Sequence, residues 1–207
     1  MLLPPLPSDY LERLHTLEAA YLSQTDPLKQ SGFGGDFTSW QKKRGIVLDT
    51  INQDGTFLDV GCANGYLLEC LMRWANERGI TLIPYGVDVG PRLIRLAQHR
   101  LPHWADHFFV GNIWDWEPPR RFHFVSTSLC VPEAYKPLLF QKLITQVVEP
   151  GGRLILRCYY KTAVTGSQLD YFDTYFDHRR FLCEQGLRPV GSVTSDPPGA
   201  EYVWIDC

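Results

Sequence analysis

The sequence lacks the features that mark a membrane, secreted or nucleic-acid-binding protein. No apolar run among the 207 residues approaches the length of a membrane-spanning helix. Residues 1–7 have neither the basic start nor the long apolar core of a signal peptide. The net charge is −3 and there is no basic run, so a nucleic-acid backbone finds no complementary surface. These absences predict a cytoplasmic protein that does not by itself bind membranes or nucleic acids.

The sequence also lacks a metal-binding or disulfide framework. None of its six cysteines forms a C-x-x-C pair, and reduced thiols are the simpler expectation. His99, His103 and His107 have a helix-like spacing, but Pro102 interrupts any single helix. No metal site is therefore predicted. His15 and His178 are expected on the surface or in a lid, and no catalytic dyad or triad can be identified.

One stretch does carry a strong pattern. Residues 56–60 form a short apolar run of strand type, small residues follow at Gly61, Ala63 and Gly65, and apolar residues then recur at helical spacing. Strand, tight turn and helix in that order make the first half of a βαβ unit, whose turn brings backbone N–H groups close to a ligand. Asp59, at the strand end, would repel a pyrophosphate and attract an ammonium group.

The turn differs from a dinucleotide-binding fingerprint. G-x-G-x-x-G fails here at Ala63 and Tyr66. Residues 58–65, Leu-Asp-Val-Gly-Cys-Ala-Asn-Gly, instead resemble the first motif of class I S-adenosylmethionine (SAM)-dependent methyltransferases, with Ala63 in place of the usual middle glycine. A turn that serves only chain geometry is the alternative interpretation. The resemblance implies SAM as cofactor and a binding loop made of Asp59, Gly61, Cys62, Ala63, Asn64 and Gly65.

The rest of the chain alternates strands and helices, which predicts a mostly parallel sheet covered on both faces. The expected strands are residues 56–60, 81–88, 107–110, 122–128, 153–159, 187–195 and 201–207. The expected helices are about 9–22, 39–51, 65–78, 91–101, 133–148 and 167–185. Two closing strands add an antiparallel edge element, which also resembles the methyltransferase fold. The fold class is therefore α/β, doubly wound and seven-stranded, in a single domain with a helical lid over residues 1–55 and a cofactor-binding core over 56–207.

Ligands of open α/β sheets bind at the carboxyl ends of the strands. Asp88 ends the second strand, beside Val89, and a carboxylate there can accept hydrogen bonds from ribose hydroxyls. NAD enzymes share this feature, and a cap for the helix at Pro91 is the alternative interpretation. At the end of the third strand, the methyltransferase resemblance places Asn112 and Ile113 against adenine, with the Asn112 amide oxygen accepting from the adenine amine. A turn residue is the alternative interpretation of Asn112.

The fourth strand ends near Ser128, where the resemblance implies cofactor and acceptor contacts. No Asn-Pro-Pro-Tyr sequence occurs, so methylation of DNA base amines is not indicated. The Cys130 thiol could be a nucleophile, but a buried, inert cysteine is the simpler expectation. Arg44, one helical turn after Trp40, could meet the methionine carboxylate or an acidic substrate, although a solvated arginine is the simpler alternative. The candidate substrate or lid residues are Phe37, Trp40, Arg44, Cys130, Tyr135 and Tyr159.

These observations predict a SAM-dependent methyltransferase that acts on a small molecule by direct SN2 displacement and releases S-adenosylhomocysteine (SAH). The absence of an identifiable base agrees with this chemistry, because the methyl donor is already activated. An NAD(P)-dependent oxidoreductase is one alternative, against which stand the broken fingerprint and Asp59. A non-catalytic nucleoside- or SAM-binding protein is the other.

Overall fold

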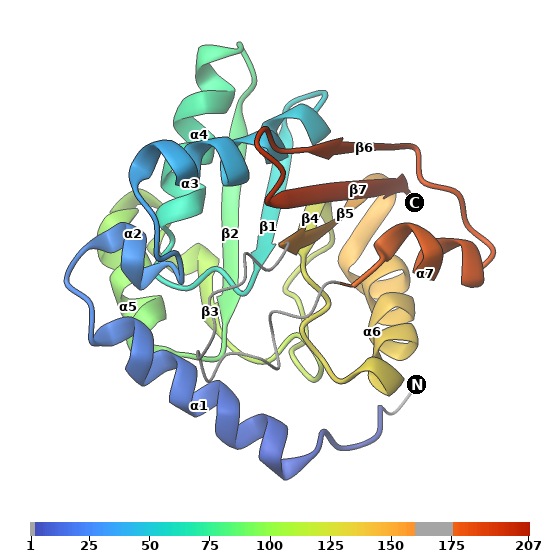
Figure 1. The fold of residues 1–207 in the computed structure, drawn as a ribbon, viewed down its shortest axis with the longest axis horizontal. Helices are drawn as coiled ribbons and strands as arrows, with labels where there is room; N and C mark the ends of the chain where they lie inside the picture. The colour runs from blue at the N-terminus through green and yellow to red at the C-terminus, as the bar shows by residue number, and fades with distance from the viewer. Residues whose placement is uncertain (1–2, 160–175) are drawn as a thin grey trace.

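The computed structural model describes residues 3–159 and 176–207 and contains one seven-stranded sheet (Figure 1). The strand order is β3-β2-β1-β4-β5-β7-β6; β7 runs antiparallel to both of its neighbours, and β3, β2, β1, β4 and β5 are parallel. This confirms the predicted fold class. The strands are β1 Gly55–Val60, β2 Leu82–Asp88, β3 Phe108–Val110, β4 Phe122–Thr127, β5 Val148–Tyr159, β6 Gly191–Thr194 and β7 Ala200–Asp206.

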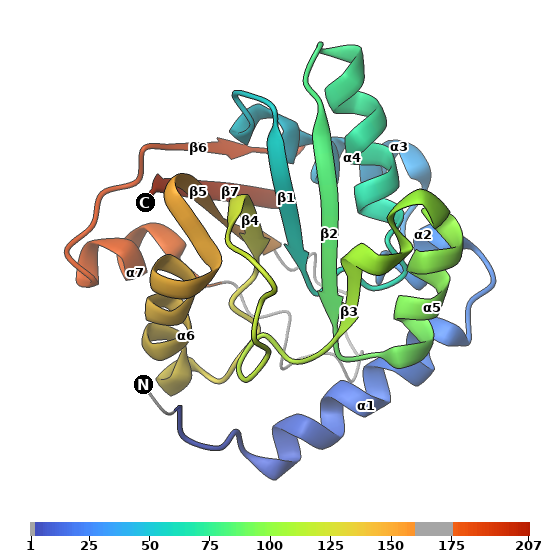
Figure 2. The ribbon, with the colours of Figure 1, turned by 180° about the vertical axis from the view of Figure 1, so that it is seen from behind.

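Each face of the sheet has its own apolar core, because successive side chains of a strand point to opposite faces. Phe57 and Phe124 pack on one face with α4 (Tyr66–Glu77) and α5 (Pro91–Arg100). Leu58 and Val125 pack on the other face with α6 (Lys136–Lys142) and α7 (His178–Glu184). From behind, α5 lies beside β2 and β3, and α6 and α7 lie at the opposite side of the sheet (Figure 2).

The segment before β1 is helical and partly covers the sheet. It contains α1 (Ser8–Leu22), α2 (Pro27–Gln30), α3 (Phe37–Arg44) and a 3₁₀ helix at Gly45–Thr50. In Figure 1, α1 crosses below the lower ends of the parallel strands. Within the described ranges, no helix is both long and apolar enough to cross a membrane.

Two predicted helix boundaries in this segment differ from the structure. The helix expected at 39–51 begins at Phe37, because the Asp36 carboxylate accepts a hydrogen bond from the Ser39 N–H at 2.7 Å and caps it. It becomes a 3₁₀ helix at Gly45. The helix expected at about 9–22 begins one residue earlier, at Ser8.

A third difference lies around Pro150–Gly152, between the helix expected at about 133–148 and the strand expected at 153–159. The helical segment is divided into a 3₁₀ turn (Glu133–Tyr135), α6 and a π-helical turn (Leu143–Val147), and β5 already begins at Val148. The pairing of β5 with β4 shifts register between Phe122 and Phe124. The glycines therefore form an irregularity inside β5.

The helix expected at 167–185 lies partly outside the described residues. Its described part is α7, which begins at His178 and is capped by the Asp177 carboxylate, an acceptor of the Arg180 N–H at 3.0 Å. The two closing strands form the predicted antiparallel pair, β6 with β7.

Candidate active site

A cavity opens at the carboxyl ends of the parallel strands, where open α/β sheets bind ligands. Residues from the ends of β1, β2 and β5, and from the loops after β3 and β4, line its floor. Helix α1 supplies part of its opposite wall through five residues: Tyr10, Leu14, Leu17, Glu18 and Tyr21. α1 is tied to the site at both ends, since the Tyr10 hydroxyl donates to the Cys130 carbonyl and the Glu18 carboxylate accepts from the Arg92 N–H at 2.7 Å.

The glycine turn after β1 forms one edge of the cavity. Gly61 and Ala63 line it, and both have positive φ, 77° and 47° respectively. Ala63 thus holds a left-handed conformation that costs a non-glycine residue energy. Gly65, with φ of 72°, does not line the cavity; a side chain there would meet the Cβ of Ala97 at 2.9 Å, so glycine is required for close packing of the turn on α5.

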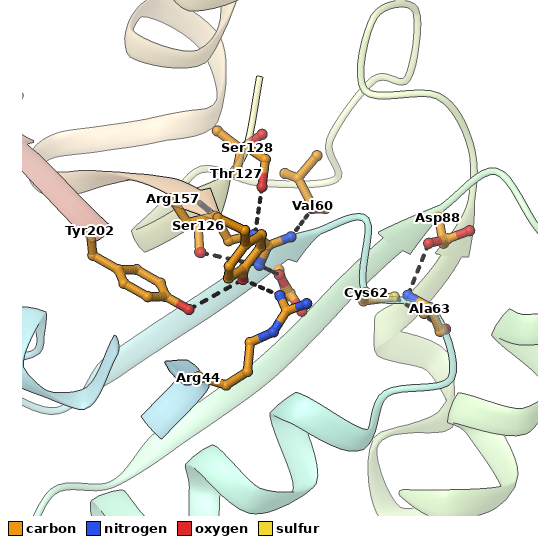
Figure 3. Close-up of polar contacts among 12 residues, drawn as sticks. Arg44, Val60, Cys62, Ala63, Asp88, Ser126, Thr127, Ser128, Arg157 and Tyr202 are labelled. Carbon is orange, nitrogen blue, oxygen red and sulfur yellow. Dashed lines mark hydrogen bonds and ion pairs between the residues drawn. The ribbon is translucent and has the colours of Figure 1, made fainter. Parts of the chain in front are cut away.

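Asp88 joins the end of β2 to this turn (Figure 3). One carboxylate oxygen accepts from the Ala63 N–H at 2.9 Å and the other from the Gly90 N–H at 2.9 Å. Burial raises the pKa of Asp88, and the two backbone N–H groups oppose that rise. The side chain makes no capping bond to α5, so the alternative interpretation as a helix cap is not realised. Because a carboxylate can accept about four hydrogen bonds, Asp88 keeps capacity for hydroxyl groups in the cavity.

Asp59 requires a correction. The sequence suggested that its carboxylate would face an ammonium group of the ligand, but Asp59 is 2% exposed, does not line the cavity and pairs with Arg157 of β5. Arg157 also donates to the Val60 carbonyl at 2.7 Å and to the hydroxyls of Ser126 at 3.3 Å and Ser128 at 3.0 Å. The guanidinium thus joins β1, β4 and β5 beneath the cavity, which it also lines.

Arg157 was missed by the sequence analysis. The available signal was a charged residue within the apolar run of β5, since arginine is seldom fully buried without a partner. Burial alone would lower the pKa of the guanidinium, but the adjacent Asp59 carboxylate raises it, so Arg157 stays charged.

Asn112 and Ile113, which were predicted to meet adenine, line the cavity together with Val89 and Ser128. The Asn112 amide oxygen, which was expected to accept from adenine, accepts from the Trp114 N–H at 3.1 Å in a local turn. Its amide nitrogen is buried and has no hydrogen-bond partner among the described residues. In this arrangement the nitrogen, a donor, is the group free to meet a ligand.

Unpartnered buried nitrogens are concentrated at this one cavity. In the described part of the chain, the buried side-chain nitrogens without a partner are Asn112 Nδ2, Arg44 Nε and both ring nitrogens of His178. All three residues line the cavity. Because buried polar groups in folded proteins are normally satisfied, these nitrogens are the candidate contacts for a polar ligand in the cavity.

The position of His178 also differs from the sequence prediction. It was placed on the surface or in a lid, but it is 2% exposed and lies in the cavity wall. Burial lowers its pKa to about 3, and the positive charge of Lys136 acts in the same direction. Lys136, Cys130, Cys158 and Phe176 line the cavity as well. These residues lie in or next to β4, β5, α6 and α7. Asp88 ends β2 and Asn112 follows β3, so these two residues lie on the other side of β1 in the strand order.

Three of the candidate substrate or lid residues line the cavity: Arg44, Cys130 and Tyr159. Arg44 is not the solvated arginine of the alternative interpretation. Its guanidinium lies 3.8 Å from the centre of the Tyr159 ring and donates to the Tyr159 hydroxyl, which in turn lies 3.3 Å from the Tyr202 hydroxyl. Cys130, expected to be buried, is exposed.

The remaining candidates do not line the cavity. Trp40 is buried between Tyr66 and Trp74, with ring centres 4.9 and 5.6 Å away, and Phe37 is 41% exposed. Tyr135 packs against Trp114 instead.

Two residues of the predicted cofactor loop, Cys62 and Asn64, also do not line the cavity. Cys62 packs against Gly86, and the Asn64 amide donates to the Pro27 carbonyl at 2.8 Å, which attaches the glycine turn to α2.

The seven-stranded sheet with its antiparallel β7, and the cavity beside the glycine turn, can be compared with known proteins. No protein-family model matches the sequence, and no curated protein matches it. Solved structures do match.

A SAM-dependent methyltransferase from Aquifex aeolicus is 17% identical, with a TM-score of 0.57 over 94% of this chain and 97% of its own. The 1,6-didemethyltoxoflavin-N1-methyltransferase of Burkholderia thailandensis, with its substrate and SAH bound, is 13% identical, with a TM-score of 0.65 over 100% and 92%. The magnesium protoporphyrin IX methyltransferase of Synechocystis, with SAM bound, is 14% identical, with a TM-score of 0.61 over 99% of each chain.

Proposed function

We propose that this protein is a SAM-dependent methyltransferase that acts on a small molecule. The observation that carries the proposal is the polar lining of the cavity: the Asp88 carboxylate beside the glycine turn, and the unpartnered amide nitrogen of Asn112 on the neighbouring strand end. The likeness of the fold to methyltransferases solved with SAM or SAH supports it.

The residues present fit this cofactor. Asp88 would accept from the ribose hydroxyls, and the Asn112 amide and Ile113 would meet the adenine ring. Arg44, with its unpartnered Nε, would hold the methionine carboxylate. When bound, SAM supplies an activated methyl group on a positively charged sulfur, which a nucleophile displaces directly with SAH as the leaving group.

The contribution of the protein is then to position the two reactants and to exclude water. α1 lies over the cavity, and its apolar residues Leu14 and Leu17 face the same space as the strand ends. Arg157 holds the strand ends in register through its bonds to β1 and β4. The net charge of −3 favours a small acceptor over a nucleic acid.

Calorimetric titration tests the cofactor assignment against the oxidoreductase alternative. SAM and SAH are expected to bind at one site per chain, and NAD is expected to show no saturable binding. Transfer of radiolabel from methyl-labelled SAM to a small molecule then separates an enzyme from a non-catalytic SAM-binding protein. Binding of NAD in preference to SAM would contradict the proposal.

We further propose that α1 acts as a lid over the cofactor. Leu17→Ala removes an apolar lid residue that lines the cavity and is expected to weaken SAH binding by about fivefold, which corresponds to about 1 kcal/mol of lost apolar contact. Leu11→Ala is the matched control, since Leu11 lies on the same helix, is 40% exposed and does not line the cavity. Equal affinities in the two variants would show that α1 does not contact the cofactor.

A further inference from the structure

The side of the cavity formed by β5, α6 and α7 contains two nitrogen-bearing side chains with unused hydrogen-bonding capacity. His178 is buried, and neither ring nitrogen has a partner among the described residues. Lys136 is half-buried; its ammonium donates to the Leu129 carbonyl at 2.6 Å and lies 4.4 Å from the centre of the Phe176 ring. Since an ammonium has three donors, Lys136 keeps donors for a ligand.

The positive charge of Lys136 has no direct counter-charge in the residues that the structure describes. Burial lowers the pKa of Lys136, and Cys130 and Glu133 oppose that shift; Asp177 opposes the lowering of the His178 pKa. Asp177 itself is engaged as the cap of α7. Of the two arginines that line the cavity, Arg157 is paired with Asp59, and Arg44 is assigned to the methionine carboxylate.

We propose that the methyl acceptor binds as an oxygen anion, a carboxylate or an ionised phenol, held by the Lys136 ammonium and by an N–H of the His178 imidazole. The inference rests on the proposed methyltransferase function and adds the charge state of the acceptor and the residues that recognise it. A charged donor beside the Phe176 ring, with donors left over for a ligand, favours an anion over a neutral molecule of the same shape.

The state of His178 agrees with an acceptor that is already ionised. With its pKa lowered to about 3 the imidazole is neutral near pH 7, and so weak a base contributes little to proton removal. A neutral imidazole still offers one N–H donor. Transfer to an ionised oxygen releases no proton: an oxygen lone pair forms the O–CH₃ bond, the S–CH₃ bond breaks with its electrons on sulfur, and the two opposite charges cancel.

Calorimetry on the SAH-loaded protein tests the proposal with two matched pairs at mildly alkaline pH. Benzoate is compared with methyl benzoate, and 4-nitrophenolate with 4-nitroanisole. Because hydrogen bonds to charged groups are worth about 1.5–3 kcal/mol, the anion of at least one pair is expected to bind about tenfold to a hundredfold tighter than its neutral methyl product. Which pair shows the preference distinguishes a carboxylate acceptor from a phenolate.

Three variants test whether Lys136 and His178 cause the preference for the anion over its methyl product. Lys136→Met is expected to abolish it, Lys136→Arg to retain most of it, and His178→Phe to reduce it by about tenfold. Lys42→Met, which removes an exposed lysine of α3, is the matched control and should leave it unchanged. Equal affinities for anion and methyl product with SAH bound, or a preference that survives in Lys136→Met, would overturn this inference alone. Failure of SAH to bind would contradict the proposed function and this inference with it.

Discussion

Asp88→Ala is expected to weaken SAH binding by about 10²–10³-fold. The carboxylate stands beside the glycine turn and lines the cavity, and hydrogen bonds to a charged acceptor are worth about 1.5–3 kcal/mol each. Asp88→Asn should lose less affinity, because one carbonyl acceptor survives. Direct calorimetric titration of SAH into each folded variant measures the effect.

The same substitution also removes the acceptor of the Ala63 and Gly90 N–H groups, so the thermal midpoint is expected to fall. Asp54→Ala controls for that loss. Asp54 accepts a hydrogen bond from the Thr81 N–H at 2.7 Å, near the start of β2 and therefore at the opposite end of that strand. Its variant should bind SAH like the unmodified protein. A lowered midpoint with unchanged affinity in Asp88→Ala would mean that Asp88 only braces the turn.

Asp59→Ala is expected to destabilise the fold by about 3–5 kcal/mol, the cost of leaving a buried charge without its partner. Arg157→Met should cost less, because a buried carboxylic acid can take up a proton and become neutral, whereas a guanidinium cannot lose one. Denaturant unfolding of both variants measures the two free energies and their order.

Arg153→Met on the same strand is the matched control. Arg153 pairs with Asp206 at 2.7 Å and also donates to the Thr50 carbonyl at 2.7 Å. The Asp206 side chain is 48% exposed, and ion pairs with so exposed a partner contribute about 1 kcal/mol or less. A loss in Asp59→Ala no larger than in this control would contradict the view that the buried pair joins β1 and β5.

The errors of the sequence analysis have tertiary causes. Pro150–Gly152 were expected to end a helix, yet they lie within β5 because the chain pairs with two neighbours there. Val148 is opposite Phe122 of β4, and the Gly151 N–H donates to the Cys207 carbonyl at 2.6 Å. Neither partner is near in sequence, so local pattern alone favours a turn.

By itself, the sequence determined the order of strands and helices, the glycine turn and the position of Asp88 at a strand end. These features depend on periodicity, turn residues and a short crossover between adjacent strands, all of which are local. Only the tertiary structure decided the partner of Asp59, because Arg157 is 98 residues away and meets it only when β4 lies between β1 and β5. It likewise decided that His178 is buried in the cavity, since α6 and α7 pack on one face of the sheet and their side chains meet at its ligand edge.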